Sequence, residues 1–82
     1  MEKLEASFTI LIMSIGSSAL MAMGLTPDPQ SGKTEVDKDM ARFNIDLLSL
    51  VKEKTKNNLD QEEKNFLDQM LADLQSKYLQ LK

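Results

Sequence analysis

The sequence predicts an all-α protein of three helices, and three observations lead to this prediction. Apolar residues recur at steps of three and four along two segments, which is the repeat of an amphipathic helix. Glycine, proline and asparagine interrupt the pattern, and residues typical of helix starts follow. No segment alternates between apolar and polar residues as a half-buried strand does. We therefore expect one helical domain over residues 1–82, with helices at about 4–23, 38–56 and 61–80.

The first expected helix begins near Leu4 or Ser7 and ends with a recognisable cap. Gly24 is able to adopt the left-handed conformation after the last turn, and the leucine that follows it is placed to fold back, as in a Schellman motif. Pro27 then prevents the helix from continuing. Residues 25–36 contain two prolines, a glycine and several small polar residues, so we expect an irregular surface loop.

The second expected helix, at 38–56, begins after Asp37, a residue type that commonly caps helix N-termini, and Thr34 is the alternative cap. Asn57 or Asn58 suits the left-handed position that ends such a helix. Its main line of apolar residues consists of Met40, Phe43, Leu47, Leu50 and Val51. A second set widens the apolar face beyond this line: Ala41, Ile45 and Leu48.

The third expected helix, at 61–80, begins with Asp60 and Glu63 at the spacing of a capping box, in which each side chain binds the other residue's backbone N–H. Its apolar residues recur at steps of three and four: Leu67, Met70, Leu71, Leu74, Tyr78 and Leu81. The short link from the second helix favours an antiparallel hairpin. We expect this hairpin to pack against the apolar first helix.

The composition argues against several classes of function. The chain has no Cys and no His, which removes disulfides, thiolate chemistry and the commonest metal ligand. The net charge of −3 opposes sequence-independent nucleic-acid binding, which depends on cations that neutralise phosphates. The lack of Cys fits a reducing compartment, so we expect a cytoplasmic protein. No complete catalytic or ligand motif is present, so we expect a non-enzymatic protein without catalytic residues, cofactor or metal.

Two partial motifs in the loop do not meet their own requirements. Residues 31–34, SGKT, imitate the end of a phosphate-binding P-loop, but Pro27 stands where its first glycine belongs. Residues 28–39 have the length of a calcium-binding EF-hand loop, but Lys33 occupies the position of its turn glycine. We therefore interpret both stretches as a surface turn that leads into a helix cap.

Residues 6–25 contain no charged side chain, and this stretch has the length of a membrane span. Several hydroxyl side chains and Gly16 dilute its apolar character, and its N-terminal flank carries Glu2 and Glu5 rather than a basic cluster. The same acidic flank is unlike a secretory signal peptide. We favour a segment buried inside a soluble protein. A small membrane-anchored adaptor, with residues 6–25 as its transmembrane segment, is the alternative interpretation.

A buried first helix needs more cover than its own chain offers. Phe8 and Ile12 lie on one face whereas Ile10 and Met13 lie on others, and a helix that is apolar on all sides must be buried on all sides. Two helices do not surround it, so we expect a homo-oligomeric interaction or assembly protein, with a dimer as first choice and an unidentified protein partner as a further option. The predicted contact residues lie on one side of this helix: Leu11, Ser14, Ile15, Ser18 and Ala22.

A series of short motifs runs along the chain in the order SSAL, MG, PDPQSGKTEVD, AR, IDLL, EKTK, NL, EE and DLQSKYLQ. In order and spacing these motifs resemble a bacterial family catalogued as domain of unknown function 1844, from about Phe8 to Tyr78. The proline loop followed by KTEVD, and the stretch KTKNNL, are its most distinctive parts. The resemblance implies a small, cytoplasmic, helical protein without an established activity, so it carries no catalytic or binding residue onto this chain.

Overall fold

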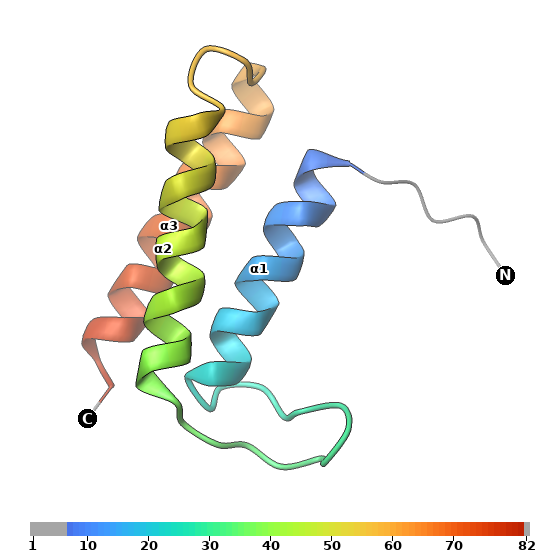
Figure 1. Cartoon of the computed structure of the whole chain (residues 1–82), viewed down its shortest axis with the longest axis vertical. Coiled ribbons are helices and arrows are strands. Elements are labelled where there is room, and N and C mark those ends of the chain that lie inside the picture. Colours follow the sequence, from blue (N-terminus) through green and yellow to red (C-terminus); the bar gives the residue numbers. More distant parts are fainter. Residues whose placement is uncertain (1–6, 82) are drawn as a thin grey trace, which may run out of the picture.

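The computed structural model describes residues 7–81 and contains three helices, α1 (Phe8–Ala22), α2 (Lys38–Lys54) and α3 (Gln61–Leu79). Figure 1 shows α1 and α2 side by side and running in opposite directions, with α3 behind α2. No strand occurs within residues 7–81, where the only β-type pairing is a single bridge between Met23 and Val36. The predicted all-α class is therefore confirmed, as is the packing of the first helix against the other two.

α1 is capped at both ends by side chain and backbone groups that the sequence predicts. Ser7 Oγ accepts a hydrogen bond from the third helical N–H at 3.1 Å, so the described helix begins after the later of the two expected starts. The expected residues 4–6 lie outside the described part of the chain. Gly24 has a φ of 74°, and the N–H groups of Gly24 and Leu25 donate to carbonyls in the last turn, each at 3.0 Å. These two bonds form the expected Schellman motif.

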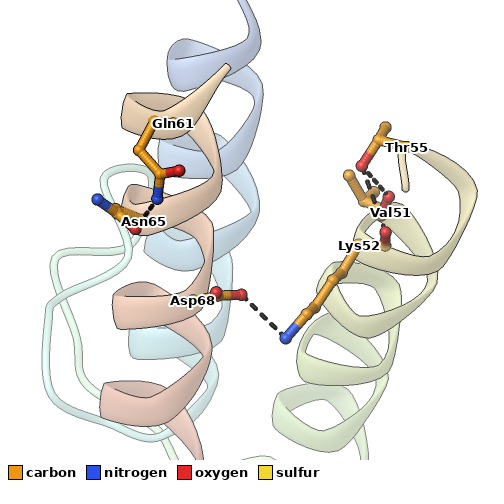
Figure 2. Close-up of polar contacts among 6 residues, drawn as sticks. All are labelled: Val51, Lys52, Thr55, Gln61, Asn65 and Asp68. Atoms are coloured by element: carbon orange, nitrogen blue, oxygen red, sulfur yellow. Dashed lines mark hydrogen bonds and ion pairs between the residues drawn. The ribbon is translucent and has the colours of Figure 1, made fainter. Parts of the chain in front are cut away.

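α2 begins at the cap that the sequence favours and ends two residues before the expected boundary. Asp37 Oδ1 accepts a hydrogen bond from the third helical N–H at 3.1 Å. At the other end, Thr55 Oγ1 donates to the carbonyl of Val51 at 2.7 Å (Figure 2). Asn57 then adopts a φ of 71°, the left-handed conformation that asparagine tolerates better than most residues. The chain turns there into α3.

α3 begins with the complete capping box. Glu63 N–H donates to Asp60 Oδ1 at 2.8 Å, and Asp60 N–H donates to Glu63 Oε1 at 3.1 Å. On the exposed side of α3, Gln61 Nε2 donates to Oδ1 of Asn65, one turn further along the helix, at 2.9 Å (Figure 2). Asp60, Glu62 and Glu63 place negative charge at the positive end of the helix dipole, so helix stability explains why acidic residues gather here.

The loop between α1 and α2 is closed at its base by backbone contacts. Asp37 N–H donates to the carbonyl of Ala22 at 2.7 Å, next to the bridge between Met23 and Val36. Within the loop, the N–H of Gln30 donates to Asp28 Oδ1 at 2.7 Å, which forms an Asx turn. These contacts join the end of α1 to the start of α2 and hold the two helices antiparallel.

The hydrophobic core lies where the three helices meet. Its largest fully buried side chains are Ile12, Met23, Leu48, Leu67 and Leu74. Gly16 of α1 is buried as well, and a Cβ built there would lie 2.8 Å from Met70 Sδ of α3. The absence of a side chain at this glycine therefore lets α3 approach the backbone of α1.

The molecule is flat, which limits how much of α1 its own chain covers. The Cα atoms extend over 37 × 36 × 16 Å. The Cα atoms of one helix span only about 4.6 Å across its axis, and packed helices lie about 8–10 Å apart, so the shortest extent holds two layers of helices. Ile12, Gly16 and Ala19 face the other two helices and are buried, whereas Ile10 and Met13 remain about half exposed. α1 is thus covered on one side.

Candidate functional site

Exposed apolar side chains gather on α1, α2 and the loop between them. Within residues 7–81, nine large apolar residues are exposed: Ile10, Leu11, Met13, Leu25, Val36, Met40, Phe43, Leu50 and Leu79. Only Leu79 belongs to α3, where it is the last helical residue. The side of the molecule formed by α1 and α2 is therefore the candidate interaction surface.

Two lines of residues form the centre of this surface, which we call the α1/α2 face. The line on α1 is Leu11, Ser14 and Ser18, and the line on α2 is Met40, Phe43, Leu47 and Leu50. In each line the residues recur at steps of three and four, so they share one side of their helix. Ser18 and Met40 line the same cleft, which shows that the two lines adjoin across the α1–α2 contact.

This cleft has a volume of about 560 Å³ and lies where the loop covers the end of the α1/α2 face. Asn44 lies at its base. It is 7% exposed, and its Nδ2 donates to the carbonyl of Met40 at 2.9 Å. Asp28, Lys33 and Glu35 of the loop line its rim. Among the described residues, no three acidic side chains come together as a group that could hold a metal ion.

A second cleft, of about 780 Å³, lies beside the turn between α2 and α3. Lys52 Nζ of α2 lies 2.9 Å from Asp68 Oδ1 of α3 on its wall (Figure 2). Asp68 Oδ1 is itself shielded from water, and the Lys52 ammonium is the charged group beside it. Both side chains are well exposed, so the ion pair contributes little to stability. We interpret this cleft as the space at the end of the α2–α3 hairpin.

The five contact residues predicted from the sequence fall in different environments. Leu11, Ser14 and Ser18 are exposed and belong to the α1/α2 face. Ile15 is partly buried and packs against the core beside them. Ala22 is 8% exposed and lies within its own chain's core. The small residues of α1 are therefore divided, since Gly16 and the alanines face the other two helices while the serines face solvent.

The sequence indicated a wide apolar face on α2, and the structure divides this face between the core and the surface. Three residues of the main apolar line, Met40, Phe43 and Leu50, are 49%, 55% and 48% exposed. The residues expected only to widen it are the ones that fill the core: Ala41, Ile45 and Leu48. The width of the apolar face indicated that part of it would be exposed. A helix with two adjoining apolar lines buries only one of them in a single packing contact.

None of the helices within residues 7–81 is long and apolar enough to cross a membrane. α1 has 15 residues, whereas a helical span needs about 20. The segment 6–25 expected under the alternative interpretation ends instead in the Schellman motif and the loop.

The described residues thus define a small three-helix α protein with one half-exposed apolar face. A family model described as "Domain of unknown function (DUF1844)" matches residues 5–80. The chain therefore belongs to this family, which confirms the resemblance seen in its motifs. No curated protein matches the chain, and no solved structure matches it.

Proposed function

We propose that this protein is a non-enzymatic assembly module that associates with a second copy of itself through the α1/α2 face. The observation that carries the proposal is the row of half-exposed apolar side chains on α2, led by Phe43 and Leu50. Core packing within one chain does not use this row, because Ala41, Ile45 and Leu48 already fill the contact with α1 and α3. A second copy would give the row a partner.

The exposed apolar area supports a contact of this kind. Leu11, Met40, Phe43 and Leu50 are each 48–55% exposed. Taking the roughly 150–250 Å² that a large aromatic side chain buries as a guide, these four leave about 300–500 Å² in water. A typical monomer's largest apolar patch covers roughly 300–600 Å², and such patches often mark interaction sites. The area would form the centre of an interface that buries about 800 Å² on each partner.

The face also has the character of an interface centre. Its seven residues are apolar or carry a small hydroxyl, and none is charged. Depletion of charge is what distinguishes the buried centre of an interface from the rest of a protein surface. Small residues on α1, Ser14 and Ser18, leave room for close approach of another helix. In a two-fold symmetric dimer the same surface of both copies meets, so this surface must be complementary to itself.

Sedimentation equilibrium across a wide concentration range tests the proposal. We expect the unmodified chain to form a dimer, and Phe43→Glu to be monomeric with unchanged helix content, because Phe43 contributes little to the core of its own chain. The matched control is Leu79→Glu, which places the same charge at an exposed apolar position on α3 and should leave the dimer intact. A folded monomer at every concentration of the unmodified chain would contradict the proposal.

A further inference from the structure

The line of apolar residues on α2 has charges of opposite sign at its two ends. Asp39 precedes Met40, four residues before Phe43, and Lys54 follows four residues after Leu50. Residues four apart are neighbours on a helix surface, so both charges border the apolar line. Both side chains are exposed, and neither forms an ion pair with another residue in the part of the chain that the structure describes.

The neighbouring residues repeat this asymmetry. Residues 35–39 carry three acidic side chains and one lysine, and residues 52–56 carry three lysines and one glutamate, so the net charge is negative at the first end and positive at the second. The positions of Asp39 and Lys54 are separated by 15 residues, or about 22 Å along a helix that rises 1.5 Å per residue. Leu47, the third residue of the apolar line, lies next to the midpoint between them.

We propose that two copies meet with their α2 helices antiparallel, about a two-fold axis beside Leu47, so that Asp39 of each copy lies against Lys54 of the other. This inference rests on the proposed self-association and adds its direction and its specificity. The axis lies in the interface, perpendicular to the helices, and pairs opposite charges twice by symmetry. It also sets α1 against the second copy's α1, where Ser14 and Ser18 allow a close contact.

The other two-fold arrangement of the same face leaves these charges unmatched. An axis parallel to the helices would place α2 over the α1 of the second copy. The described α1 residues carry no charge, so Asp39 and Lys54 would border an apolar helix and lose part of their hydration without gaining a partner. Electrostatic complementarity therefore favours the antiparallel pairing of the α2 helices.

Charge reversal tests this arrangement. We expect Asp39→Lys and Lys54→Asp each to weaken dimerisation at low ionic strength, by about two- to thirtyfold in Kd, because two exposed ion pairs are lost. The double variant restores both pairs with their signs exchanged and should recover the original Kd. Lys64→Asp is the matched control, since it makes the same charge change at an exposed position on α3. Salt of about 1 M, which shortens the Debye length to about 3 Å, should remove the differences.

Cross-linking gives an independent measure of direction, because the chain contains no native Cys. We expect a mixture of the Asp39→Cys and Lys54→Cys variants to form a disulfide-linked pair between the two different variants, while either variant alone does not cross-link. If the unmodified chain is dimeric but the charge variants behave like the control, or if Asp39→Cys cross-links to itself, the antiparallel arrangement is wrong and self-association stands. A monomeric unmodified chain would overturn both.

Discussion

Substituting Gly16 by alanine adds one methyl group at the point where α3 packs against the backbone of α1. The new Cβ would lie 2.8 Å from Met70 Sδ and 3.2 Å from Met70 Cε. Non-bonded carbon atoms have their energy minimum at about 3.5–4.0 Å, so the added methyl is too close to both atoms. Met70 must therefore move before the added methyl fits, and the effect of the substitution depends on this one neighbour.

Two opposing contributions set the change in the free energy of unfolding. Alanine is favoured over glycine in a helix interior by about 1 kcal/mol. Overpacking costs about 1–3 kcal/mol, and the flexible methionine side chain keeps this cost in the lower part of that range. We expect Gly16→Ala to leave the free energy of unfolding unchanged or to lower it by up to about 1 kcal/mol. In a Met70→Ala background the clash is absent, so Gly16→Ala should raise the free energy of unfolding by about 1 kcal/mol.

Urea denaturation followed by far-UV circular dichroism measures these four proteins as a double-mutant cycle. All four should be compared at one protein concentration, because self-association makes apparent stability depend on concentration. The coupling between positions 16 and 70 should be about 1–2 kcal/mol. If Gly16→Ala were equally stabilising with and without Met70, α3 would not pack against this part of α1, and the described core would be wrong.

Further predictions concern the core, the caps and the turn. Leu48→Ala should destabilise the fold by about 2–5 kcal/mol because Leu48 is fully buried, whereas Leu50→Ala should cost the monomer about 1 kcal/mol or less and should weaken dimerisation, as denaturation and sedimentation would show. Equal losses of stability would mean that the two sides of α2 are wrongly assigned. Asp60→Ala removes the capping-box acceptor and should cost about 0.5–2 kcal/mol in the same denaturation assay, and an unchanged midpoint would show that the box is not formed in solution. Asn57→Gly should be neutral or mildly stabilising because φ is 71° there, while Asn57→Val should destabilise, and the opposite order would argue against the left-handed turn.

The positions of the helices were predictable because their signals lie within a few residues of each helix end. Asp37 and Asp60 cap the N-termini of α2 and α3, and Gly24 and Asn57 take the left-handed positions after α1 and α2. Each of these features depends on the backbone and side chains of one turn, so distant parts of the chain do not change it.

The candidate surface was predictable only in part. The excess of apolar residues on α1 indicated that its own chain could not cover it, and Ile10, Leu11 and Met13 are indeed about half exposed. The exposure of Phe43 and Leu50 on α2 did not follow from the sequence, because they belong to an apolar line as regular as any core line.

The sequence by itself determined three helices and most of the caps at their ends, and it indicated that more apolar surface is present than one small bundle buries. Only the tertiary structure decided which side of α2 faces inward. Ala41 and Ile45 allow α1 and α3 to lie closer to the α2 backbone than the bulkier Met40 and Phe43 would. The core therefore forms on the side of α2 that carries Ala41 and Ile45. Helix boundaries follow from local hydrogen bonding, whereas the choice between two apolar sides depends on the shapes of helices that lie far apart in the chain.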